Sequence, residues 1–237
     1  MNALRFSRFV IVFAALLFAG SPLAAPLPAF TARYQLLQNG ELIGEATMTL
    51  APSGDDEWTF TTQSRGTSGM AALLGANVRE TSRFHWKAAL PEGLSYDYSL
   101  DAAIKHKERH VRFDWASNTI SVDDKGEQRF AAQPGTIERH TLVLAIAVGL
   151  DAGQRAFAFP VAVRDRIETQ HFAVQGKGTI KVPEGSYAAT HVARTDGGGF
   201  DAWFAPGKLP VPVQVSQHDN GDLTMKLESY TAGARAE

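Results

Sequence analysis

From residue 30 onward, apolar and polar residues alternate with a period of two, and turn-forming residues interrupt this alternation about every 8–12 residues. Residues 94–100 are typical, because leucines and tyrosines there alternate with serine and aspartate. A β-strand places successive side chains on opposite faces, so such segments build antiparallel sheets with one buried face. The pattern restricts the chain to a mostly β fold.

The clearest turn signal is Asn39-Gly40, which separates the alternating segments 30–38 and 41–50. Both central positions of a type I′ turn need positive φ, and Asn followed by Gly suits them. The sequence therefore predicts a β-hairpin at this place.

Two segments depart from the alternation. Residues 138–150 are apolar nearly all round and predict one buried helix, whereas the glycine-bounded residues 66–76 predict a short helical insert. We expect a single domain over residues 30–231, built as a twisted antiparallel sheet or sandwich that curls toward a barrel. The alanine-rich tail 232–237 should fray.

Residues 1–25 combine a short basic stretch, an apolar run over residues 9–18 and an ending rich in small residues. This is the layout of a secretory signal peptide, and the run is shorter than the about 20 residues of a membrane-spanning helix. We predict cleavage between positions 24 and 29, export to the periplasm and no transmembrane anchor. The chain has no cysteine, which excludes disulfides, a thiolate nucleophile and lipidation at a lipobox.

Loss of the signal peptide would leave 21 Lys and Arg against 25 Asp and Glu. Nucleic acids are bound by clustered positive charge, so this mildly acidic balance argues against a nucleic-acid partner.

Several separate stretches carry a family resemblance: Val174–Val192, Trp203–Pro206 and Leu209–Val213, together with Tyr34 and its neighbouring glycines and Phe113–Trp115. In this order they resemble DUF3108, a family of exported bacterial proteins of unknown function. The resemblance implies an envelope-exported antiparallel β protein with one helix against its sheet, and it implies no reaction. Such proteins often begin the helix with Asp and a Ser three residues later, where this chain has Glu138 and Thr141.

One cluster has metal-binding chemistry. His106, Glu108 and His110 fall on one face of a predicted strand, and two imidazoles with a carboxylate are an acceptable set of ligands for zinc. Lysines and an arginine occupy the opposite face, so a solvated ribbon without metal is the alternative that we favour.

The insert offers a second kind of site, because a curled sheet with inward aromatics can leave an apolar cavity that a short helix closes. Met70, Leu73 and Leu74 would form such a lid, or else a permanent plug. Arg65, Arg79 and Arg83 would meet an anionic head group, or else be solvated.

We interpret the chain as a periplasmic, non-catalytic protein that binds an envelope component, either an apolar or lipid-like ligand or a partner protein. The alternatives are a metal-dependent enzyme at His106, Glu108 and His110, and an envelope assembly scaffold without a small ligand. No cofactor is expected, and the oligomeric state stays open.

Overall fold

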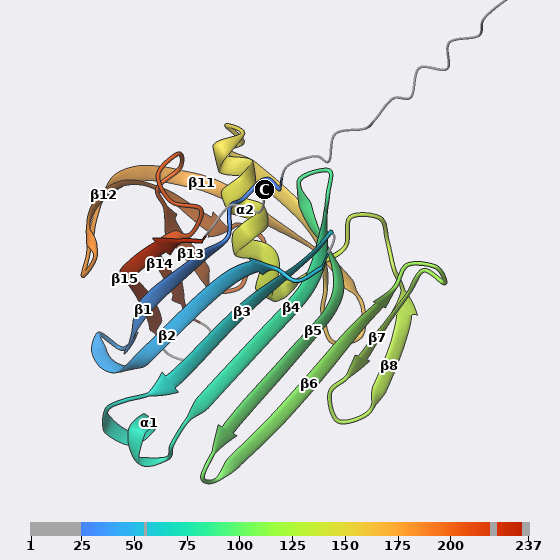
Figure 1. The fold of residues 1–237 in the computed structure, drawn as a ribbon, viewed down its shortest axis with the longest axis horizontal. Coiled ribbons are helices and arrows are strands. Elements are labelled where there is room, and N and C mark those ends of the chain that lie inside the picture. The colour runs from blue at the N-terminus through green and yellow to red at the C-terminus, as the bar shows by residue number, and fades with distance from the viewer. Residues whose placement is uncertain (1–24, 55, 219–221, 234–237) are drawn as a thin grey trace, which may run out of the picture.

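The computed structural model describes residues 25–54, 56–218 and 222–233, so nearly all of the predicted signal peptide lies outside the described part. All strands belong to one sheet of 15 strands (Figure 1). The first eight form an up-and-down meander in which each strand pairs with the next: β1 (Phe30–Gln38), β2 (Glu41–Pro52), β3 (Glu57–Gly66), β4 (Asn77–Lys87), β5 (Leu90–Ala102), β6 (Lys105–Asp114), β7 (Thr119–Asp123) and β8 (Glu127–Ala131).

The chain then crosses over and builds the other half of the sheet. Strand β9 pairs in parallel with β10, and the remaining strands form a second antiparallel meander that ends beside the first. These strands are β9 (Ile137–Glu138), β10 (Ala156–Ala162), β11 (Ile167–Val182), β12 (Gly185–Arg194), β13 (Phe200–Phe204), β14 (Pro212–Gln217) and β15 (Leu223–Ala232). Because β15 pairs with β1, the first and last strands of the chain join the two halves.

The predicted hairpin is confirmed, since β1 and β2 are joined at Asn39-Gly40 with φ of 50° and 85° at these residues. Strand β15 extends to Ala232, which pairs with Phe30. Residue 232, the first residue of the tail that we predicted to fray, is therefore paired in the sheet.

The sheet is open, and it curls so that its two halves face one another. Strand β9 lies against β5, and Ala162 at the end of β10 is buried in one cluster with Tyr96, Val111 and Phe113 of β5 and β6. The prediction of a mostly β fold that curls toward a barrel is therefore confirmed.

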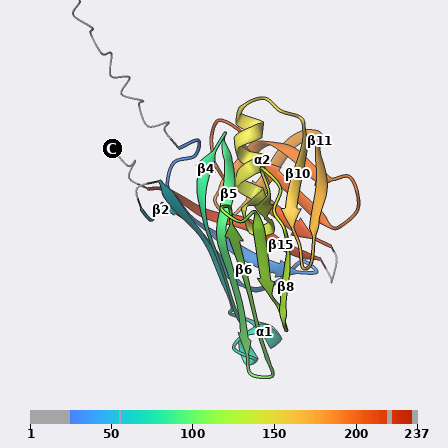
Figure 2. The same ribbon diagram turned by 90° about the vertical axis from the view of Figure 1, so that its right-hand side faces the viewer.

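Helix α2 (Leu142–Asp151) fills one end of the curl, preceded by the 3-10 turn η1 (Arg139–Thr141). Figure 2 shows α2 between β4 and β5 on one side and β10 and β11 on the other. Seven of its ten residues are buried, which explains why the predicted helix is apolar nearly all round. The insert forms only the short helix α1 (Gly69–Leu73), and none of its residues is buried.

One buried hydrogen bond joins the two halves of the sheet. The Tyr34 hydroxyl on β1 donates to the Pro212 carbonyl at the start of β14 over 2.9 Å, and Tyr34 has no exposed surface. Pro212 has no amide to pair, and the ladder between β13 and β14 shifts register there.

Tyr34→Phe is expected to lower the free energy of unfolding by about 1–2 kcal/mol, because it removes one buried hydrogen bond and leaves the ring in place. Urea denaturation of both proteins measures the difference. A loss below about 0.3 kcal/mol would show that the hydroxyl contributes nothing net.

Candidate functional site

A cavity of about 350 Å³ lies inside the curl, beside the start of α2. The lining comes from strands β2, β3 and β4 of the first half of the sheet and from strands β11 to β15 of the second half, and η1 and α2 close one end. Gly198 and Arg139 are exposed lining residues, so the cavity communicates with solvent.

The lining divides by chemistry. The apolar lining side chains are Met48, Phe60, Leu142, Val143, Val163, Phe172, Phe200, Val215 and Met225. The polar lining residues are Thr62, Glu80, Arg139, His140, Glu168, Gln170, Arg194 and Gln217. Small-molecule sites likewise combine apolar walls with placed polar groups.

Arg194 is already committed to protein partners. Its guanidinium donates to Glu168 over 2.7 Å and to Asp196 over 2.6 Å. Burial raises the pKa of Asp196, but hydrogen bonds from Arg194 and His171 outweigh this and lower the pKa to about 2. This group is therefore a fixed part of the wall.

Arg139 differs from Arg194. It lies on η1 at the cavity, it is exposed, and among the described residues its side chain has no hydrogen bond or ion pair. Glu80 also lines the cavity, where it accepts a hydrogen bond from the Tyr96 hydroxyl over 2.7 Å. Burial and the neighbouring Glu80 raise the pKa of Tyr96, so the phenol stays protonated and donates.

His140 forms the centre of a polar cluster at one edge of the cavity. Its ring stacks on Phe60 with centroids 4.4 Å apart. Its Nε2 lies 2.8 Å from the Thr62 hydroxyl and its Nδ1 lies 2.8 Å from the Ser82 hydroxyl. Thr62 is on β3 and Ser82 is on β4, so the imidazole ties η1 to two neighbouring strands.

Glu138 completes this cluster and caps the turn. Its carboxylate accepts the backbone amides of His140 and Thr141 over 2.7 and 2.9 Å, and it accepts the Ser82 hydroxyl over 2.5 Å. Glutamate is uncommon as a helix N-cap. Here its longer side chain reaches both the free amides and the opposing strand, although the residue is only 2 % exposed.

The direction of the hydrogen bonds follows from the donors available. Ser82 has one proton and gives it to Glu138, so it accepts from His140 Nδ1, and Thr62 donates to Nε2. The order is therefore His–Ser–Glu, whereas a catalytic triad places the histidine between serine and acid. Ser82 is 1 % exposed and has no space for a substrate. The cluster positions the start of α2 and one wall of the cavity.

The residues that we predicted as a lid lie elsewhere. Helix α1 occupies the far end of the β3–β4 hairpin (Figure 1), and none of Met70, Leu73 and Leu74 lines the cavity. The alternation of side chains along β4 explains why Arg79 and Arg83 do not line the cavity. Glu80 and Ser82 face the inside of the curl, so Arg79 and Arg83 face the outside.

The histidine strand shows ion pairs. His106 Nδ1 lies 2.6 Å from an Asp101 carboxylate oxygen, His110 Nδ1 lies 2.6 Å from Asp97, and Glu108 lies 3.5 Å from His106. The hydrogen bond that the His106 ring donates to Asp101 raises the pKa of His106. Within the described ranges, no group of three or more His, Asp and Glu side chains is arranged to hold a metal ion.

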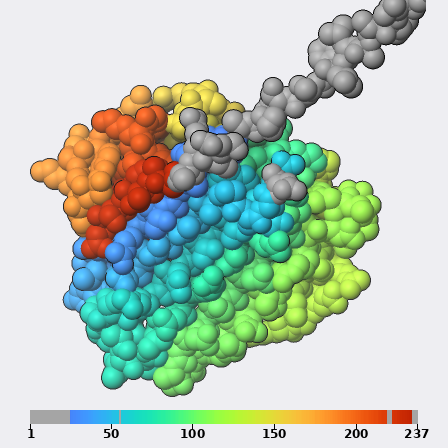
Figure 3. Space-filling model, viewed as in Figure 1, coloured from blue at the N-terminus to red at the C-terminus, as the bar shows by residue number. Residues whose placement is uncertain are grey.

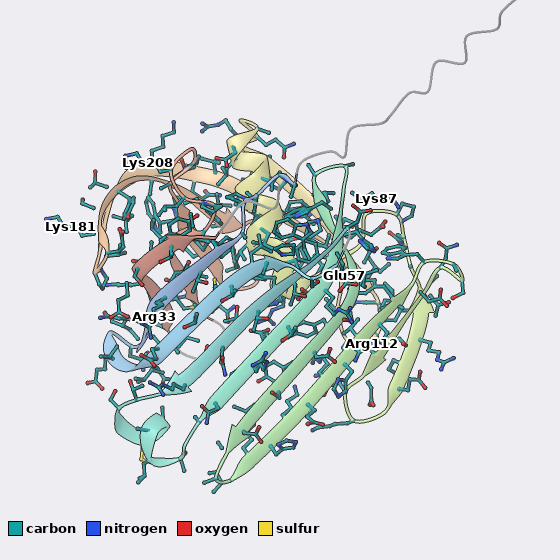
Figure 4. All side chains as sticks on the ribbon, viewed as in Figure 1. Arg33, Glu57, Lys87, Arg112, Lys181 and Lys208 are labelled. Atoms are coloured by element: carbon teal, nitrogen blue, oxygen red, sulfur yellow. The ribbon has the colours of Figure 1, made fainter. Side chains whose placement is uncertain are left out.

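Charged side chains are spread over separate strands. Arg33 on β1, Arg112 on β6 and Lys181 on β11 lie far apart in Figure 4.

The residues of the cavity come from twelve separate elements or loops, and sequence patterns reveal no such convergence. Only at the start of the predicted helix did the sequence point to residues beside the cavity. Glu138 and Thr141 replace the expected residues at that start, and Glu138 proves to be the cap.

The fold and cavity define an open, curled antiparallel β protein with an internal pocket. The chain matches the model of the family described as "Protein of unknown function (DUF3108)" over residues 30–228, and it belongs to this family. No curated protein matches the chain. Within the described residues, no helix has the length and apolar character required to span a membrane.

Two solved structures are similar. One is a β-barrel-like protein of domain of unknown function DUF1849 from Brucella abortus, with 12% identity, coverage of 89% of this chain and 100% of that chain, and a TM-score of 0.48. The other is a putative lipoprotein from Parabacteroides distasonis ATCC 8503, with 9% identity, the same coverage of 89% and 100%, and a TM-score of 0.33.

Proposed function

We propose that this protein is a non-catalytic periplasmic protein that binds one amphipathic small molecule, with an apolar body and an anionic group, in the cavity of the curl. The cavity volume of about 350 Å³ carries the proposal, together with the free Arg139 at its edge. Ligand pockets span about 300–1,000 Å³, so a single slender molecule fits.

The apolar body would lie along the sheet wall. Met48 and Phe60 come from the first half of the sheet, and Phe172, Val215 and Met225 come from the second half, so a chain between the two halves is removed from water on both sides. Burial of apolar surface contributes about 25 cal/mol per Å².

The anionic group would pair with Arg139. An arginine that already holds two carboxylates, such as Arg194, gains little from a third. Arg139 lacks such a partner among the described residues, and its planar guanidinium suits a carboxylate or phosphate.

Export is supported by the sequence of residues 1–25 alone. A periplasmic protein meets envelope lipids and their breakdown products, which have the required apolar body and anionic group.

Dodecanoate is the probe for the test, titrated below its micelle concentration by isothermal calorimetry. We expect one molecule bound per chain, and about tenfold or greater weakening in Arg139→Gln, because a charge-assisted hydrogen bond contributes about 1.5–3 kcal/mol. Val143→Phe is expected to abolish binding by filling the cavity that Val143 lines.

Two control variants are matched to these changes. Val148→Phe enlarges a half-buried valine of the same helix that does not line the cavity, and Arg155→Gln removes an exposed arginine beyond the other end of α2. Both should bind dodecanoate normally. Absence of binding, or binding that Val143→Phe leaves intact, would contradict the proposal. Equal affinity for dodecyltrimethylammonium would contradict the role of Arg139.

A further inference from the structure

The large hydrophobic side chains that are exposed in the described structure are gathered at one end of the sheet. They are Leu42 at 50% exposure, Met70 at 65%, Leu73 at 76% and Ile104 at 83%. Leu42 is the second residue of β2, Met70 and Leu73 are on α1, and Ile104 is in the turn between β5 and β6. We name these four residues the apolar tip.

Hydrogen bonds to backbone carbonyls join the three segments of the tip. The Ser68 hydroxyl donates to the Leu42 carbonyl, and the Thr67 amide donates to the Ile43 carbonyl over 2.9 Å. On the other side, the Ala103 amide donates to the Leu74 carbonyl over 2.9 Å. The exposed side chains are therefore held on one shared framework.

The tip projects from the molecule. Figure 2 shows the sheet extending away from α2 and ending at α1, and Figure 3 shows the α1 segment adjoining the β5–β6 turn at one corner. Isolated exposed hydrophobic residues are ordinary on protein surfaces. Four of them on one projecting end, with none elsewhere in the described chain, form a surface that marks an interaction site.

Charges beside the tip are mostly paired. Arg65 pairs with Glu45, and His106 pairs with Asp101, both over 2.6 Å. Arg79 and Lys105 have no ion pair among the described residues at this end, and neither has Glu41, whereas His106 lies beside two carboxylates, Asp101 at 2.6 Å and Glu108 at 3.5 Å. Arg79 and Lys105 are therefore the cations that remain available to anionic groups among the described residues of this end.

We propose that the apolar tip inserts into the interfacial region of a lipid bilayer, with Arg79 and Lys105 at the level of the phosphates. A stable protein partner needs about 20–30 residues on each side, and a narrow end made of three turns offers far fewer. A bilayer surface requires only a few projecting apolar side chains with cations around them, since apolar burial and attraction to anionic lipids act together. The proposal is independent of the cavity and its ligand.

The test is sedimentation of the signal-free full chain with vesicles of phosphatidylcholine, with and without phosphatidylglycerol. We expect binding to both, tighter with phosphatidylglycerol because of the unpaired cations. The double variant Leu73→Asp and Ile104→Asp should bind at least about tenfold more weakly, since each change removes an apolar contact and adds a charge.

The fold should survive these changes, because both residues are highly exposed and α1 buries no residue. Circular dichroism and the melting temperature check this. Ala152→Asp, at an exposed site after α2, adds one charge away from the tip and should bind vesicles normally.

The proposal would be overturned if the wild-type protein did not sediment with vesicles. It would also be overturned if the double variant sedimented as well as the wild type. Light scattering supplies a further contrary result. If the wild type were a dimer that did not bind vesicles, and the double variant were a monomer, the tip would be assigned to a second copy of the chain. Normal dodecanoate binding by the double variant keeps this test separate from that of the cavity.

Discussion

Glu138→Ala is expected to lower the free energy of unfolding by about 3–5 kcal/mol, because it leaves several buried hydrogen-bond donors without an acceptor. The carboxylate accepts the amides of His140 and Thr141 and the hydroxyl of Ser82. Each buried donor without a partner costs about 1–3 kcal/mol. The same residue closes the curl, since Glu138 ends β9 in one half of the sheet and Ser82 lies on β4 in the other.

Urea denaturation followed by tryptophan fluorescence measures this loss. Glu127→Ala is the matched control, because Glu127 lies exposed on β8 and pairs only with exposed Arg129. The control should change stability by less than about 1 kcal/mol. A Glu138→Ala protein as stable as the control would mean that water replaces the carboxylate at no cost.

The second large effect is a dependence of stability on pH that Glu138 causes. Burial raises the pKa of its carboxyl from 4.5 to about 7, against the hydrogen bond from Ser82 and the two backbone amides. The folded protein therefore binds more protons than the unfolded chain between these values, so this contribution destabilises the fold as pH rises. One pKa unit corresponds to about 1.4 kcal/mol, and the whole change is roughly 3 kcal/mol.

His140 acts in the opposite direction. Burial lowers the pKa of its imidazole, so the unfolded chain takes up a proton first as pH falls, and the fold loses stability on the acid side. The two groups are joined through Ser82, and a plain pH profile of the wild type contains both contributions.

A difference measurement separates them. Glu138→Gln keeps an acceptor oxygen and His140 but cannot titrate at position 138, so the wild type should lose roughly 3 kcal/mol relative to this variant between pH 4 and pH 8. Chemical denaturation of both proteins across this range gives the difference. A difference that stayed constant across this range would show that the pKa of the Glu138 carboxyl is ordinary. A wild type that became more stable relative to the variant as pH rose would show that the three hydrogen bonds to the carboxylate outweigh its burial.

Much of the fold could be predicted from local sequence, because strands and hairpins depend on neighbouring residues. Alternation marked the strands from residue 30 onward, Asn39-Gly40 marked the hairpin, and an all-round apolar segment marked the helix near residues 138–150. The helix begins at Leu142 after a 3-10 turn, since Glu138 uses its side chain rather than a helical backbone to satisfy the first amides.

The placement of the sites depended on contacts between distant residues. The insert 66–76 is apolar in sequence, as a lid would be, yet it ends an extended hairpin, and the cavity formed near the start of α2 instead. His140 had no local motif, because its partners Thr62 and Ser82 precede it by 78 and 58 residues.

The sequence by itself determined the β character, the hairpin at Asn39-Gly40 and the buried helix, all of which rest on the period of the side chains and on the conformations open to Asn and Gly. Only the tertiary structure decided that β9 meets the opposite half of the sheet, that Glu138 and His140 hold it there, and that an apolar tip and a cavity lie at separate places. The physical reason is that the curl of a long sheet is the sum of small twists over 15 strands, and no local pattern fixes where its ends meet.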